Sequence, residues 1–171
     1  MNLIAIDPGI NKTGIAVFTD GVLTASRLLA SLSNSWSRLE ELRDQLLRGI
    51  GGTNISVVVE LPQIYRAVKS KGDPNDLIKT ATVGAYLLGV LCEYSPVSET
   101  TFVHPGDWCK IPKSTKKGAV SGRTDKILGC LNEAERARVL VQHDAIDAVG
   151  IGLWKLGRFE RKNIFPGAAN A

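Results

Sequence analysis

Residues 3–24 read LIAIDPGINKTGIAVFTDGVLT and contain the patterns that decide the fold. Leu3–Ile6 is a short apolar run that a Pro-Gly turn ends, and Thr13–Thr19 is a second run rich in β-branched residues, so both are predicted to be strands. Asp20-Gly21 separates the second run from a third, which is a strong signal for a β-hairpin. The chain is therefore predicted to open as an antiparallel meander of three strands.

Helical and strand patterns alternate after the meander. From Ser35 the apolar residues Trp36, Leu39, Leu42 and Leu46 recur at helical spacing. Residues 56–59 are apolar without alternation, as in a central strand, and residues 101–103 form a fifth short strand. Further helices are predicted over about 76–92, 124–131, 133–139 and 144–156. We expect an α/β fold with a mixed five-stranded sheet, a three-strand antiparallel meander plus two parallel strands, and helices on both faces.

The longest predicted helix is capped by Asn75 or Asp76 and runs to about Cys92. It is apolar nearly all round, and such a helix is buried on more than one side. Because one sheet cannot cover it alone, we expect a homodimer to which this helix contributes a contact.

Length and composition indicate one globular domain over residues 1–171. With 44% hydrophobic and 22% charged residues, the chain belongs to neither the disordered nor the membrane-embedded class. No secretory leader opens the sequence, and its longest uncharged run, Thr80–Cys92, is too short for a membrane span. Three cysteines suit neither a disulfide framework nor a zinc site. We therefore expect a cytoplasmic protein without a membrane partner.

The net charge of +4 is concentrated in one segment, Trp108–Lys126, which carries a single acid, Asp125. Its basic residues are Lys110, Lys113, Lys116, Lys117, Arg123 and Lys126. This distribution favours a nucleic-acid partner over an ordinary solvated loop. Tyr65 is an isolated aromatic in a polar stretch, as suited to the core edge as to stacking on a base.

Four acidic residues are candidates for the chemistry. Asp7 and Glu60 end the first and fourth strands, and neighbouring parallel strands would place both at one edge of the sheet, where α/β sheets bind ligands. Asp144 and Asp147 are three apart on an otherwise apolar helix, so one helix face would carry both toward the first pair. Four close carboxylates raise one another's pKa unless cations intervene. Oxygen ligands select Mg²⁺ or Mn²⁺, and two such ions catalyse phosphoryl transfer.

Each acid also has a structural interpretation. The Asp7-Pro8-Gly9 sequence makes a good turn in any protein, and Glu60 could be a solvated strand end. Asp144 could simply cap its helix, which would leave Asp147 alone to be explained. His143 next to it would ordinarily be a surface or cap residue.

The order of these motifs resembles the RuvC family of Holliday junction resolvases, within the ribonuclease H-like superfamily. Residues 4–14 are similar to the family's opening, and Val58-Val59-Glu60 is similar to its second acidic motif. Residues 116–126 resemble its Lys-and-Gly segment, and residues 144–148 its closing Asp-x-x-Asp-Ala helix. The resemblance spans Leu3 to about Trp154.

The resemblance implies a homodimer that nicks opposed strands of a four-way DNA junction with two Mg²⁺ or Mn²⁺ ions per site. The implied ligands are Asp7, Glu60, Asp144 and Asp147, with Lys116 and Lys126 along the scissile phosphate. The other expected DNA contacts are Lys113, Lys117, Arg123 and Tyr65. A bacterial or phage-infected cell is the implied setting, and the compact length suits a phage member.

Two other functions compete with the nuclease. A non-cleaving module for branched nucleic acid would share the basic segment, but its four acids would weaken binding to phosphates. An actin-like or sugar-kinase-like phosphotransferase also opens with a strand ending in Asp-x-Gly. That fold needs two such domains, and 171 residues hold one.

Overall fold

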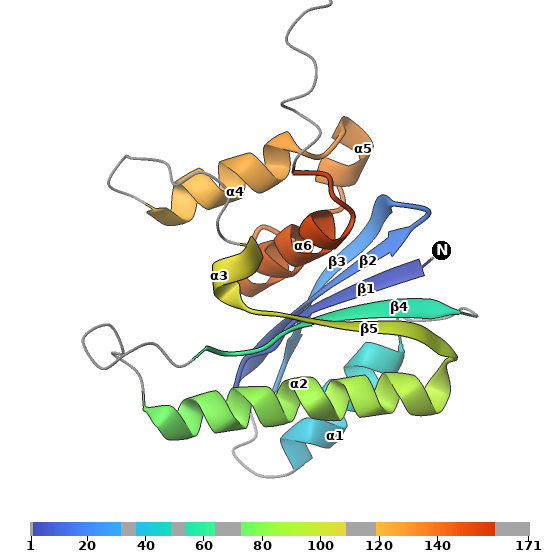
Figure 1. Cartoon of the computed structure of the whole chain (residues 1–171), viewed down its shortest axis with the longest axis vertical. Coiled ribbons are helices and arrows are strands. Elements are labelled where there is room, and N and C mark those ends of the chain that lie inside the picture. Colours follow the sequence, from blue (N-terminus) through green and yellow to red (C-terminus); the bar gives the residue numbers. More distant parts are fainter. Residues whose placement is uncertain (1, 32–36, 49–53, 64–72, 109–118, 160–171) are drawn as a thin grey trace, which may run out of the picture.

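The structure is a computed structural model that describes residues 2–31, 37–48, 54–63, 73–108 and 119–159 (Figure 1). Its centre is a five-stranded sheet in the order β3-β2-β1-β4-β5. The strands are β1 (Asn2–Asp7), β2 (Lys12–Thr19), β3 (Val22–Ala30), β4 (Ile55–Glu60) and β5 (Val97–Val103). The pairs β1–β2 and β2–β3 are antiparallel, whereas β1–β4 and β4–β5 are parallel. The predicted mixed sheet is confirmed, and β5 begins four residues before the predicted residue 101.

The hairpin between β2 and β3 forms at the predicted dipeptide. Asp20 and Gly21 both have positive backbone φ angles, 51° and 79°, which is the backbone of the tight turn whose twist matches that of antiparallel strands. Asp and Gly are among the residues that adopt this conformation at low cost. The turn therefore sets the pairing next to it, Thr19 with Val22 and Phe18 with Leu23, and an irregularity between Val17 and Phe18 shifts the register of the remaining pairs.

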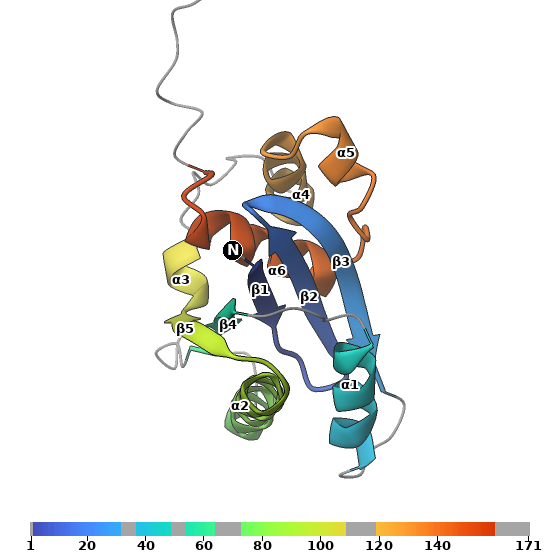
Figure 2. The ribbon, with the colours of Figure 1, turned by 90° about the vertical axis from the view of Figure 1, so that its right-hand side faces the viewer.

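Helices cover both faces of the sheet (Figures 1 and 2). On one face α1 (Ser37–Leu47) and α2 (Pro74–Tyr94) enclose a core that includes Ile4, Ile6 and Val57. On the other face α6 (His143–Lys155) packs on β1, β2 and β3, and its core includes Phe18 and Val149. The shorter helices α3 (Pro105–Trp108), α4 (Ala119–Gly129) and α5 (Glu133–Arg136) lie on the α6 side. The predicted stripe of α1 is buried at Leu39, Leu42 and Leu46, and Trp36 lies outside the described residues.

Helix boundaries differ from the predicted ones in physically clear ways. The cap of α2 is Asp73, not Asn75 or Asp76, because its carboxylate accepts a hydrogen bond from the Asn75 N–H and Pro74 occupies the first turn. Helix α4 begins at Ala119, five residues before the predicted start, and ends at Gly129. The first residues of this helix include glycine and serine, which have low helix propensity, so the sequence pattern did not predict a helix there.

Within the part of the chain that the structure describes, helix α2 is packed on one side only, and the further burial expected from a homodimer stays a prediction. Val83, Leu87 and Leu91 are buried, whereas Ile78 is 65% exposed. The exposed positions Ile78, Thr82, Ala85, Gly89 and Cys92 follow one another at helical spacing. Of the described helices, α2 alone is long and apolar enough to cross a membrane by length and composition. Its buried residues Val83, Leu87 and Leu91 pack in the core on one face of the sheet.

Candidate active site

Asp7 and Glu60 stand side by side at one edge of the sheet. The parallel ladder of β1 and β4 pairs Ile6 with Val59, and each acid is the next residue of its strand. Alternate residues of a strand point to one face, and Ala5 and Val58, two residues earlier, both pack in the core beneath α6. Both carboxylates therefore lie on the α6 face, at the shared edge of the sheet that the strand ends predicted.

The first turn of α6 lies directly against the strand that pairs with Asp7. Gly14 of β2 is the ladder partner of Asp7, and a Cβ atom at Gly14 would lie 1.9 Å from the backbone oxygen of Asp144. Any side chain at position 14 would therefore push α6 away from the sheet. This close approach brings Asp144 and Asp147 to the edge at which β1 ends.

The four acids, called the acid cluster below, are close enough for the other three to influence the pKa of Asp7. Burial raises the pKa of Asp7 well above its usual range, and the carboxylates of Glu60, Asp147 and Asp144 raise it further. Burial also raises the pKa of Glu60 and that of Asp147, each against a lowering by Arg123. Mutual repulsion of this kind is expected of carboxylates that share a site.

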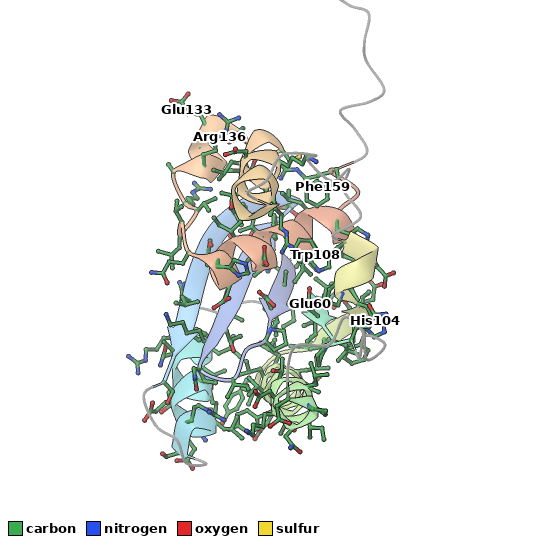
Figure 3. All side chains as sticks on the ribbon, turned by 90° about the vertical axis from the view of Figure 1, so that its left-hand side faces the viewer. Glu60, His104, Trp108, Glu133, Arg136 and Phe159 are labelled. Atoms are coloured by element: carbon green, nitrogen blue, oxygen red, sulfur yellow. The ribbon has the colours of Figure 1, made fainter. Side chains whose placement is uncertain are left out.

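Glu60 is held by an aromatic residue that is distant in sequence. The indole N–H of Trp108 donates a hydrogen bond to Glu60 Oε2, and this bond opposes the effect of burial on the pKa of Glu60. Trp108 is buried against α6, where a Cβ atom at Gly150 would lie 2.7 Å from its ring. Figure 3 shows Glu60, Trp108 and His104 close together where β4 and β5 meet α3. His104 donates from Nδ1 to the Leu61 carbonyl oxygen at 3.3 Å.

Asp147 is held by a cation from α4. Arg123 donates from its guanidinium to Asp147 Oδ2 at 2.7 Å, and the same guanidinium lies 5.3 Å from the ring centroid of Trp108. His143 approaches Asp144 at 3.3 Å and Asp147 at 3.7 Å. Arg123, Trp108 and His143 thus surround the acids with donors.

The donor set fits Mg²⁺ or Mn²⁺ in kind. Carboxylate oxygens are the ligands that these hard cations prefer, and the raised pKa of Asp7 marks a site where added positive charge is stabilising. As the side chains lie, however, no three His, Cys, Asp or Glu residues of the described part are grouped closely enough to hold an ion. Two carboxylate oxygens accept hydrogen bonds from N–H donors instead, that of Glu60 from Trp108 and that of Asp147 from Arg123. Ion binding would therefore require these side chains to reorient.

The structure does not support the alternative roles of these acids as a helix cap or a solvated strand end. The cap of α6 is Gln142, whose side chain makes no capping hydrogen bond, and Asp144 lies in the first turn. Asp147 is buried with only 6% of its surface exposed, and Glu60 accepts the Trp108 hydrogen bond. A helix cap or a solvated strand end does not account for these placements.

Solved structures with this architecture include Holliday junction resolvases. The chain is similar to RuvC from Thermus thermophilus in complex with a Holliday junction substrate, with a TM-score of 0.59 at 18% identity over 95% of this chain and 96% of that chain. A second T. thermophilus RuvC structure gives 0.54 at 18% identity, over 95% and 97%. The chain has the RuvC fold.

The likeness extends to a second resolvase. Ydc2, the yeast mitochondrial Holliday junction resolvase, matches with a TM-score of 0.50 at 15% identity, over 93% of this chain and 80% of that chain. No family model matches the sequence, and no curated protein does. The predicted ribonuclease H-like sheet is thus confirmed by the structure of the RuvC neighbours.

Several predicted DNA contacts lie outside the described residues, namely Tyr65, Lys113, Lys116 and Lys117. Of the two that are described, Arg123 contacts Asp147, whereas Lys126 on the same helix makes no ion pair with any of the four acids. Trp108 had no expected role beyond its position at the head of the basic segment. Its contact with Glu60 spans 48 residues, and no local pattern indicates such a pair.

Proposed function

We propose that the chain is a divalent-metal-dependent endonuclease that resolves four-way DNA junctions by paired phosphodiester cuts. The observation that carries the proposal is the convergence of Asp7, Glu60, Asp144 and Asp147 at one edge of a sheet with the RuvC fold. These four residues would hold two Mg²⁺ or Mn²⁺ ions. When bound, two ions neutralise phosphodiester charge and activate water.

Other residues of the chain would position the acids and bind the DNA. Trp108 orients Glu60 through its indole N–H, and the buried Asp147 projects from a helix that Gly14 admits close to the sheet. Lys113, Lys116, Lys117 and Lys126 would hold the DNA backbone, with Tyr65 available to stack on a base. Each such lysine should contribute about one unit to the slope of log affinity against log salt concentration.

Paired cuts need two active sites, and the exposed side of α2 supports a homodimer. Ile78, Thr82, Ala85, Gly89 and Cys92 form an apolar or small-residue surface that the described chain leaves exposed. A second copy that presents the same surface would cover it and place two acid clusters in one assembly. The working compartment that we propose is the cytoplasm.

A gel assay of strand cleavage tests the function. A labelled four-way junction and a linear duplex of the same sequence are each incubated with the protein in Mg²⁺, in Mn²⁺ and in chelator. We expect nicking of the junction in either ion, little nicking of the duplex, and none in chelator.

Asp7→Asn and Asp147→Asn should each lower the nicking rate by orders of magnitude, whereas Asp44→Asn, an exposed acid of α1, serves as the matched control. Junction binding without cleavage in any ion would instead favour the non-cleaving module. Undiminished nicking by a folded Asp7→Asn protein would remove the metal assignment.

A further inference from the structure

Arg123 interacts with most of the acid cluster, not with Asp147 alone. Its guanidinium lies 2.7 Å from Asp147 Oδ2. The same positive charge lowers the pKa of Asp7 and of Glu60 against their burial. One guanidinium thus stabilises the ionised forms of three of the four acids, which is the electrostatic effect that a divalent ion would have at this site.

The two partners of this ion pair differ in exposure. The Asp147 side chain is 9% exposed and the Arg123 side chain 38%. A carboxylate buried to this extent needs a cation or several donors, while a partly exposed arginine can move into solvent at small cost. The ring of Trp108 supports the guanidinium at 5.3 Å, and its indole N–H binds Glu60. The Trp108 side chain therefore contacts both Arg123 and Glu60.

We propose that Arg123 is a displaceable counter-ion of the acid cluster, which competes with the divalent ion for Asp147 and, once displaced, pairs with the DNA backbone. The inference rests on the proposed function, because it assumes that Asp147 is a metal ligand. Asp147 Oδ2 cannot accept the short guanidinium hydrogen bond and ligate an ion along the same direction. Metal binding and phosphate binding by Arg123 would then reinforce each other.

The test is calorimetric titration of Mn²⁺ into the full-length protein without DNA. Wild type is compared with Arg123→Gln and with Lys126→Gln, which removes the same charge from the same helix but from a residue without an ion pair to the acids. We expect Arg123→Gln to bind Mn²⁺ about tenfold more tightly than wild type, the effect of removing one charge-assisted competitor. Lys126→Gln should change the affinity much less.

A second measurement tests whether the displaced Arg123 binds the DNA backbone. Junction affinity is measured by fluorescence anisotropy against salt, in chelator and in Ca²⁺. In Ca²⁺ the Arg123→Gln variant should lose about one unit of salt slope relative to wild type, and in chelator the two slopes should agree. A junction is used throughout, so that both arms have the same substrate.

The outcomes separate this inference from the proposed function. Mn²⁺ binding by Arg123→Gln that is equal to or weaker than that of Lys126→Gln would overturn the competition, even if wild type nicks junctions normally. A wild type that neither binds Mn²⁺ nor nicks would overturn the proposed function itself. If Arg123→Gln fails to fold by circular dichroism, Arg123→Lys replaces it. That variant loses the forked guanidinium, and it should bind Mn²⁺ more tightly than wild type if the competition is real.

Discussion

At the scale of single residues, Asp7 has the most unfavourable charge in the cluster. Its pKa is raised by burial and by three neighbouring carboxylates, so in the folded protein it binds a proton at pH values where the unfolded chain has lost it. Stability without divalent ions should therefore fall as the pH rises above 3.8 toward the raised pKa, and stay reduced beyond it.

Asp7→Asn should remove this penalty while it abolishes nicking. In chelator at neutral pH we expect the variant to melt roughly 2–4 °C above wild type, the shift that about 1 kcal/mol produces in a domain of this size. Below about pH 3.8 the two melting curves should converge. Thermal melts across pH, with Asp44→Asn as the exposed-acid control, measure the difference. A variant less stable than wild type at neutral pH would contradict the repulsion.

Residues of the site were predictable where strand ends or helix spacing fixed them. Asp7 and Glu60 follow apolar strands, and Asp144 and Asp147 share a helix face, so the sequence alone predicted their convergence. The donors around them were not predictable in the same way. Trp108 meets Glu60, and Arg123 meets Asp147, through tertiary contacts 48 and 24 residues apart, which no local pattern encodes.

At the scale of elements, one buried ion pair ties together three parts of the fold. Glu135 of α5 is fully buried and accepts hydrogen bonds from the Leu23 N–H at the start of β3 and from the Asn132 N–H at the cap of α5. Arg158, after the end of α6, donates to both of its oxygens and also to the carbonyls of Gly21 and Cys130. The hairpin, α5 and the end of α6 are thus joined at one carboxylate.

Arg158→Met should destabilise the protein by about 3–5 kcal/mol, because it leaves Glu135 buried without its charge partner. Urea denaturation measures the loss. Arg43→Met, which breaks the exposed pair with Asp44, is the control and should change stability little, because solvent screens an exposed ion pair. The Arg158 hydrogen bonds lower the pKa of Glu135 from 4.5 to about 2. Wild type should therefore lose stability as the pH falls from 4.5 toward 2, and the variant should show a weaker dependence over that range. A loss of stability in Arg158→Met no larger than that in Arg43→Met would contradict the role of the Arg158–Glu135 pair.

Elements were predictable to the extent that local chemistry determined them. The Asp20-Gly21 turn, the two parallel strands and the buried stripe of α1 all follow from turn residues and periodicity. The start of α4 was not predictable, since its first turns contain glycine and serine and little apolar repetition. The cap of α2 was missed because Asp73 before Pro74 and Asn75 and Asp76 after it are all favourable cap residues. The hydrogen bond from the Asn75 N–H identifies Asp73 as the cap.

At the scale of the whole molecule, the exposed side of α2 leads to a prediction about assembly. Sedimentation velocity should show a dimer for wild type and a monomer for Ala85→Glu, which places a charge in the centre of the apolar surface. Glu93→Lys, an exposed change on the same helix, should remain dimeric. A wild type that sediments as a monomer at the concentrations of the nicking assay would contradict the dimer.

The sheet order has a consequence for synthesis of the protein. Asp7 and Glu60 leave the ribosome before Asp144 and Asp147, which belong to α6. A domain generally folds as a unit, and the centre of this sheet lacks its covering helix until α6 is made. A chain that lacks α6 carries Asp7 and Glu60 but not Asp144 and Asp147, so the proposed cutting activity would require α6 to be made and packed on the sheet.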